Sequence, residues 1–441
     1  MEAAAVTRTD AERALAEAFS AAKATLPGDS QVQALREAAF RRFAAEGLPH
    51  RRIEEWKYTD LRALLREAKP LAPPPAPTAR AAAKDAGKSL ADIDARRLLF
   101  VDGRFVPELS DITELEKGLS IRSMAEALAR GDPLIAAHLG KIGPQDLDGV
   151  LALNIALMLD GALIHVAAGS TVERPIHLVF ASSGEKPASV FTRSLVVIEK
   201  GARVMLVESN ECGNAYQVNS ALELLIGDDA HVDHVKIFAG EKNVVHLSSL
   251  MAAIGGRARY NDFSFVIGGA VVRNQLFLRL DGEGTTAAIR GANLLRGRQH
   301  ADNTLVVDHK VGGCQSREMF KAVLDDESRS VFQGKIIVRP KAQKTDAKMM
   351  TQALLLSENA EADNKPELEI FADDVQCGHG ATSGALDKDL KFYLMARGIP
   401  EKEAEALLVQ AFVGEAIEGI EHAGLRDALI GQVAAWLRGR R

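Results

Sequence analysis

The sequence is poor in cysteine. Only three cysteines occur among 441 residues, Cys212, Cys314 and Cys377, and no two of them form a CxxC pair. So small a number excludes a disulfide framework. It also excludes a four-cysteine zinc or iron–sulfur site made by this chain alone.

Several enzyme motifs are also missing. The sequence contains no GxxxxGK[ST] P-loop, no GxSxG and no HExxH. The pair Gly282 and Gly284 lacks the strand and helix that flank a dinucleotide site. We therefore expect that this chain binds no nucleotide.

Targeting signals and a membrane span are not evident. The most apolar long stretch, 151–169, contains Asn154, Asp160 and His165, which make it too polar to cross a bilayer. The N-terminus lacks the basic-then-apolar pattern of a secretory signal. The formal net charge of −6 offers no basic footprint for nucleic acid. We expect a cytoplasmic protein that binds neither membrane nor nucleic acid.

The sequence texture changes along the chain and predicts five regions. Amphipathic helical patterns occupy both ends, and a hairpin is predicted around the turn Asp102-Gly103. The predicted regions are an N-terminal helical region (1–69), a Pro/Ala-rich linker (70–96), a mixed hairpin and helical segment (97–161), a β-helix core (162–385) and a C-terminal helical domain (386–441).

The central region carries a repeat. Short runs of β-branched and apolar residues are separated by turns at 200–202, 227–230, 255–258 and 281–284, about 26 to 28 residues apart. A fixed period of this length is typical of stacked coils. The spacing favours a β-helix, a mainly β fold. An antiparallel sandwich or barrel remains the alternative.

Two pairs of metal-ligand residue types fall in predicted strands. His231 and His234 are three positions apart, so they point to opposite faces and are predicted not to bind one metal together. Cys377 and His379 are two apart and share a face. Thiolate and imidazole are common ligands for iron and zinc, but two ligands do not complete a coordination sphere. A shared site therefore needs a partner subunit; the alternative is a buried cysteine beside a hydrogen-bonded histidine.

Four blocks of the sequence resemble the SufD family. The stretch DDVQCGHGAT (373–382) is similar to the family motif DDVxCxHGAT. The segments NKPELEIFADD (364–374), FYLMARGIP (392–400) and GLPHRRIEEWKYTDL (47–61) also resemble family sequence, and the blocks occur in the family's order. Thr351-Gln352-Ala353 has alanine where SufB-like proteins have the cysteine of a TQC segment, so the resemblance is to SufD rather than to SufB.

The resemblance implies a fold and a function. The fold would be a right-handed parallel β-helix flanked by N- and C-terminal α-helical parts. The function would be that of a non-enzymatic scaffold subunit of the SUF iron–sulfur cluster assembly complex, pairing with the SufB paralogue and the SufC ABC-type ATPase. A transient iron–sulfur cluster would be shared with SufB, with His379 and Cys377 as candidate ligands.

The family relation also suggests that the C-terminal helices dock the ATPase. Leu407, Leu408 and Phe412 are the candidate docking residues; the alternative is that this helix face packs on its own chain. Two rival functions remain. One is a free-standing homodimeric iron-binding scaffold. The other is a β-helical carbohydrate-active enzyme, which the opposed directions of Asp373 and Asp374 on a strand disfavour.

Overall fold

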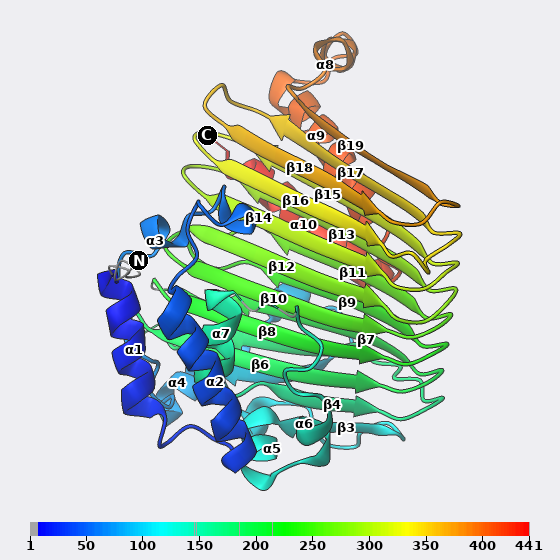
Figure 1. Ribbon diagram of the computed structural model, residues 1–441. Helices are drawn as coiled ribbons and strands as arrows, with labels where there is room; N and C mark the ends of the chain where they lie inside the picture. The colour runs from blue at the N-terminus through cyan, green and yellow to red at the C-terminus, as the bar shows by residue number, and fades with distance from the viewer. Residues whose placement is uncertain (1–7, 145, 147, 185, 214, 441) are drawn as a thin grey trace, which may run out of the picture.

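The core of the protein is a parallel β-helix built from two facing sheets (Figure 1). The computed structural model describes residues 8–144, 146, 148–184, 186–213 and 215–440. Sheet B consists of β1 Arg96–Val101, β2 Arg104–Phe105, β5 Ile176–Ala181, β7 Arg203–Glu211, β9 His231–Phe238, β11 Arg259–Val266, β13 Thr286–Leu295, β15 Gln315–Leu324, β17 Asp346–Leu355 and β19 Gln376–Gly384. Sheet A consists of β3 Leu119–Ser123, β4 Ala162–Val166, β6 Ser189–Ile198, β8 Gln217–Ile226, β10 Val245–Ile254, β12 Val271–Leu280, β14 His300–His309, β16 Arg329–Val338 and β18 Glu361–Ile370.

Successive strands from β4 onward alternate between the two sheets, so each coil adds one strand to each sheet. Pairing within a sheet is parallel throughout this part of the chain, for example between β9 and β11 and between β11 and β13. His231, Arg259 and Thr286 are register partners in these strands, 28 and then 27 residues apart. The predicted β-helix is confirmed, and the alternative of an antiparallel sandwich or barrel is wrong.

The turns that suggested the repeat contain residues in the left-handed region. Gly201 has a φ of 69° and Gly284 a φ of 72°, a conformation that glycine adopts without steric cost. Asp229 and Arg257 adopt it at 58° and 52°. The backbone reverses at these positions, and the strand that follows lies on the previous coil.

Inward-facing residues form the main core. Val232, Tyr260 and Ala287 are register partners whose side chains lie between the two sheets and are buried. Residues at alternate positions, such as Val235 and Phe263, face outward and are covered by helices instead. Both faces of these strands therefore bury apolar side chains, which is why much of their sequence reads as hydrophobic runs.

The N-terminal helices cover the outer face of sheet A (Figure 1). Outward-facing charges beneath them are paired: Arg193 contacts Glu223 at 2.5 Å and donates to Asn154 on α7 at 3.0 Å. The helices before the core are α1 Asp10–Ala22, α2 Ser30–Glu46, α3 Leu61–Leu64, α4 Pro77–Ala82, α5 Met124–Arg130, α6 Pro133–His138 and α7 Gly149–Leu157, with 3₁₀ turns η1 Glu54–Trp56, η2 Ala83–Asp85, η3 Lys88–Leu90 and η4 Pro107–Leu109.

Residues 47–61 (GLPHRRIEEWKYTDL) connect this helical layer to sheet A through buried contacts. The Trp56 ring lies over the guanidinium of Arg273, 3.7 Å from the ring centre to the guanidinium carbon. Arg273 forms a buried ion pair with Asp302, which also accepts a hydrogen bond from the Thr59 hydroxyl. Trp56 Nε1 donates to Asp148 at 3.2 Å. The motif therefore has a packing role, since its aromatic and hydroxyl groups satisfy a buried charge pair.

The segment 70–96 packs along the β-helix and has secondary structure of its own. Ala72 donates its backbone N–H to the carbonyl of Ser189 in β6 at 2.9 Å, and α4 and two 3₁₀ turns follow. After it, β1 and β2 pair antiparallel across the turn Asp102-Gly103, and β1 also pairs in parallel with β5. The hairpin therefore forms part of sheet B.

The C-terminal helices are α8 Lys388–Met395, α9 Glu401–Ile417 and α10 Ala423–Arg438. α9 and α10 cover the outer face of sheet B, where Val409, Val413 and Leu429 pack against outward-facing residues of its strands. α8 lies beyond this layer, at the top of Figure 1, and Lys391 ties it to Glu401 and Glu405 of α9 at 2.7 Å each. No described helix combines the length and the apolar character that a bilayer span requires.

The two ends of the β-helix differ. At the N-terminal end, β2 and β3 pair antiparallel to β1 and β4, and Asp160 accepts hydrogen bonds from Phe105 N and from the Ser123 hydroxyl. At the C-terminal end, β18 and β19 are the last strands of their sheets, and most of their residues are exposed or half-buried. This end is open.

Candidate functional site

Cys377 and His379 lie on β19, the edge strand at the open end. Their register partners on β17 are Ala347 and Met349, whose side chains are buried in the core between the sheets. Parallel in-register strands place partner side chains on the same face. Cys377 and His379 therefore both point toward the inside of the β-helix, where no further coil covers them among the described residues.

Cys377 is half-buried and packs against the edge of the main core. Burial raises the pKa of its thiol, and the backbone N–H of Ala347 partly opposes this shift. A metal ion binds the thiolate form, so coordination at this position would release a proton.

His379 is exposed, and both it and Cys377 are among the residues that line a pocket of about 640 Å³. Outward-facing residues of the neighbouring strands line the same pocket, among them Arg317, Lys348 and Met350. Gly378 and Gly380 occupy the alternate positions of the strand. A side chain at Gly378 would meet no atom within 4 Å, whereas a Cβ at Gly380 would lie 2.8 Å from the Met350 methyl group. A side chain at position 380 would therefore displace the flexible end of Met350, whereas position 378 has open space around it.

Glu318 is a buried carboxyl group in the same pocket that the sequence motifs did not reveal. It lies on β15 opposite Met349, so it occupies the inward-facing row that ends at His379. Burial raises the pKa of Glu318 to about 8, against an opposing effect of the Ser316 hydroxyl. Neither carboxylate oxygen forms a hydrogen bond of standard geometry. The only sequence signal was an acidic residue at an inward position of a strand.

The other two cysteines lie apart from this site. Cys212 is buried beside Tyr216 and Ala72, and burial raises the pKa of its thiol to about 12. Cys314 is buried in the main core, with its Sγ 3.3 Å from the carbonyl oxygen of Gly282. Ala353, at the position of the TQC cysteine, is buried on β17 opposite Ser383.

The candidate docking residues on α9 have unequal environments. Leu407 is 42% exposed, whereas Leu408 and Phe412 are half-buried. The Phe412 ring lies 4.4 Å from the Lys321 ammonium of β15. Phe412 therefore contributes to the attachment of α9, Leu408 is partly accessible, and Leu407 is the most exposed of the three.

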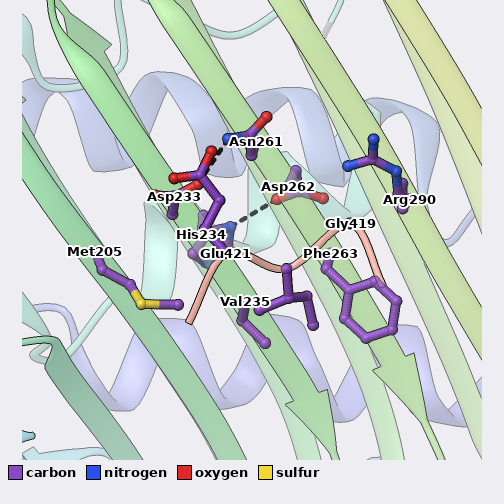
Figure 2. Close-up of a pocket in the computed structure, with 11 residues that line it drawn as sticks. Met205, Asp233, His234, Val235, Asn261, Asp262, Phe263, Arg290, Gly419 and Glu421 are labelled. Atoms are coloured by element: carbon purple, nitrogen blue, oxygen red, sulfur yellow. Dashed lines mark hydrogen bonds and ion pairs between the residues drawn. The ribbon is translucent and has the colours of Figure 1, made fainter. Parts of the chain in front are cut away.

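A second polar cluster lies between the sheets, further from the open end. Figure 2 shows the hydrogen bond of 2.7 Å from His234 Nδ1 to Asp262, and His234 Nε2 contacts Glu208 at 2.9 Å. Burial alone would lower the pKa of His234, but the two carboxylates raise it to about 9. Burial would raise the pKa of Glu208, but Lys236 and His234 lower it to about 2. As predicted, His231 faces the other way, outside the core.

Fold and site together define a β-helical repeat protein with a thiol and an imidazole at one open end. Family models match nearly all of the chain: the SufBD protein N-terminal region over residues 9–178 and the SUF system FeS cluster assembly SufBD core domain over residues 180–412. The chain belongs to the SufBD family of the SUF iron–sulfur cluster assembly system.

Individual relatives agree with this assignment. An iron–sulfur cluster assembly SufBD family protein of Synechocystis is 32% identical, with 91% of this chain and 94% of the relative aligned. The iron–sulfur cluster assembly protein SufD of Escherichia coli is 30% identical over 89% of this chain and 90% of its own length. SufD of Bacillus subtilis is 28% identical over 78% and 81%.

Proposed function

We propose that this chain is a non-enzymatic scaffold subunit that carries a nascent iron–sulfur cluster at the open end of its β-helix, with His379 and Cys377 as ligands. The observation that supports this most directly is the placement of the two side chains. They share the inward face of the last strand, at a position that the remaining coils leave accessible. Relatives over most of the chain are named as iron–sulfur cluster assembly proteins.

The cluster is a shared substrate in this proposal. One thiolate and one imidazole leave coordination positions on iron unfilled. A cysteine of a SufB paralogue supplies a further ligand, since Ala353 stands here where SufB-like proteins have the cysteine of a TQC segment. A neutral imidazole binds iron without adding charge.

The edges of β18 and β19 support a pairing partner at this end. Each strand is paired on one side only, to β16 and β17. An edge strand presents backbone N–H and C=O groups that a strand of another chain can pair with. A paralogue with the same fold has matching edges, so strand pairing would bring its ligands to Cys377 and His379.

ATP hydrolysis is assigned to a separate SufC subunit, because this sequence has no P-loop. The docking surface in the proposal joins Leu407 and Leu408 of α9 to the exposed apolar side chains of α8, while Phe412 holds α9 in place. On α8, Phe392 is 72% exposed and Tyr393 53% exposed. Large exposed apolar side chains on one short helix are typical of a protein contact.

The test is cluster assembly by the reconstituted complex with His379→Ala or Cys377→Ser in this chain. Both variants are expected to keep the complex intact and to slow cluster formation, read from its visible absorption. Thr382→Ala, on the same strand but facing outward, is the matched control. Normal assembly by His379→Ala would remove this residue from the mechanism. Loss of the complex itself would make the residue structural.

The mass of the native complex purified from its host distinguishes the proposed function from that of a free-standing homodimeric scaffold. The proposal expects a paralogue and an ATPase subunit to purify with this chain. A homodimer that binds iron without either of them would support the free-standing scaffold instead.

A further inference from the structure

A second group of metal-ligand residues lies on the outer face of sheet B, far from the open end. His231 and Asp233 are two apart on β9 and share its outward face. Glu421 lies in the turn between α9 and α10, which packs over this face. Figure 2 shows Asp233 and Asn261 on neighbouring strands, with the turn that carries Gly419 and Glu421 passing over them.

The distances within this group are longer than those of ordinary hydrogen bonds. His231 Nε2 is 3.5 Å from Asp233 Oδ2 and 3.8 Å from Glu421 Oε2, and all three atoms lie within 4.8 Å of one another. His231 Nε2 is shielded from solvent and has no hydrogen-bond partner. An imidazolium that simply paired with these carboxylates would approach them to roughly 2.8 Å. The three atoms surround a space instead.

The two separations from His231 Nε2 fit a metal ion. Zinc and similar ions bind histidine nitrogen and carboxylate oxygen at about 2.0–2.2 Å. Two ligands at about 2.1 Å in tetrahedral directions are about 3.4 Å apart, close to the separations of 3.5 and 3.8 Å here.

The second oxygen of each carboxylate is held by another residue. Asn261 Nδ2 donates to Asp233 Oδ1 at 2.7 Å, and Arg259 donates to Glu421 Oε1. These contacts leave Asp233 Oδ2 and Glu421 Oε2 directed at His231 Nε2. Hydrogen-bonded partners that orient a ligand in this way accompany metal sites generally. Arg259 is the competing cation, and its contact with the other oxygen of Glu421 keeps it outside the space.

We propose that His231, Asp233 and Glu421 form a binding site for a divalent first-row transition-metal ion, one that ties the C-terminal helices to the β-helix. One nitrogen and two oxygen ligands suit Zn²⁺ or Fe²⁺ and leave a position for water. The site is independent of the proposed cluster site. Five strand spacings of sheet B separate β9 from β19, about 24 Å.

The experiment uses the full chain with Cys377→Ser and His379→Ala, so that the open end contributes no ligands. Zn²⁺ titration by calorimetry is expected to show one binding event. His231→Gln, Asp233→Asn and Glu421→Gln are each expected to weaken it by more than about tenfold. Co²⁺ bound at the same site should absorb in the visible without a thiolate charge-transfer band. Zn²⁺ should also raise the melting temperature, and His231→Gln should abolish that increase.

His165→Gln is the matched control. His165 is 27% exposed and His231 20% exposed, and each lies beside a carboxylate, but His165 has only Glu199. Binding should survive this change. No binding event in the starting variant would overturn the proposal, as would equal losses with His165→Gln and His231→Gln. If His231→Gln does not fold, Glu421→Gln replaces it, because Glu421 lies in an exposed turn; unchanged binding by Glu421→Gln would then overturn the proposal.

Discussion

His379 and Glu318 occupy one inward-facing row of sheet B, two strands apart, with Met349 between them. Adjacent strands are about 4.8 Å apart, so the two backbones are separated by about 10 Å. A buried carboxyl group with a pKa of about 8 therefore lies in the same inward-facing row as the exposed imidazole, two strands away from it. At neutral pH this group carries a proton and adds no charge to the site.

Glu318→Gln is expected to change how stability depends on pH. The folded chain keeps the Glu318 proton up to about pH 8, whereas the unfolded chain releases it near its ordinary pKa of 4.5. Between these values the native state binds more protons, so the free energy of unfolding falls as pH rises. The variant lacks this slope and should gain stability relative to the parent from pH 5 to pH 8. Urea denaturation at pH 5 and pH 8 measures this difference in unfolding free energy. Glu361→Gln, on the exposed part of β18, is the control and should show the same pH dependence as the parent.

His234→Gln is expected to destabilise the core, and the loss of stability should be greatest at low pH. Protonated His234 stabilises the fold fully below its ordinary pKa of 6.5, and this contribution is lost as pH rises through about 9. Removing the imidazole takes the buried cation from Asp262 and leaves Lys236 as the cation beside Glu208, at a cost of about 3–5 kcal/mol. The difference in unfolding free energy from the parent should therefore be largest at pH 6 and shrink by pH 9.5. A difference that is constant with pH would contradict the assignment.

Trp56→Ala is expected to loosen the N-terminal helical layer. The ring is 1% exposed and covers the buried pair of Arg273 and Asp302. Loss of such a side chain costs about 3–5 kcal/mol. Chemical denaturation gives the size of the effect, and limited proteolysis should cut α1 and α2 first. The neighbouring exposed Lys57→Ala should stay within about 0.5 kcal/mol of the parent; equal losses would show that Trp56 is not the anchor.

Phe392→Glu and Leu407→Glu are expected to abolish binding of the ATPase subunit without affecting the fold. Both side chains are exposed, so a carboxylate there remains solvated in the free chain but would be buried in the contact. Ile430→Glu is the control, because Ile430 is 44% exposed on α10. Pull-down with the ATPase measures the effect, and melting temperatures check the fold. Equal binding by all three variants would place the contact elsewhere.

Cys377 is expected to be the reactive thiol of the native chain. It is half-buried, whereas Cys212 and Cys314 are buried inside the core. Thiolates rather than thiols react with iodoacetamide, and burial raises the pKa of Cys212 to about 12. Mass spectrometry after native labelling should find one modified cysteine, and labelling in denaturant should find three. Labelling of Cys314 before Cys377 would contradict the position of β19.

The sequence was sufficient for the repeat and for the common face of Cys377 and His379, because both depend on local spacing. It could not reveal that Glu318 lines their pocket, since that contact joins residues two strands apart in sheet B and depends on the stacking register. The pairing of β1 with β5 depends on the same non-local register.

Helix α9 shows a different limit. Apolar residues occur around its whole circumference, so periodicity did not identify the buried face. The structure buries Val409, Val413 and Ile417 against sheet B and leaves Leu407 outside. His231 and Asp233 were recognisable as sharing a strand face, but Glu421 reaches them only through the packing of a distant turn.

The difference between the two ends of the β-helix has a consequence for how much of this chain is made relative to its partner. A chain synthesised in excess has one closed end and one open end with unpaired strand edges, and the open end of another copy has matching edges. Balanced production with a partner that covers β18 and β19 would therefore keep the protein from self-association. Expression of the chain by itself should give end-to-end pairs, whereas longer polymers should not form, because β2 and β3 close the other end.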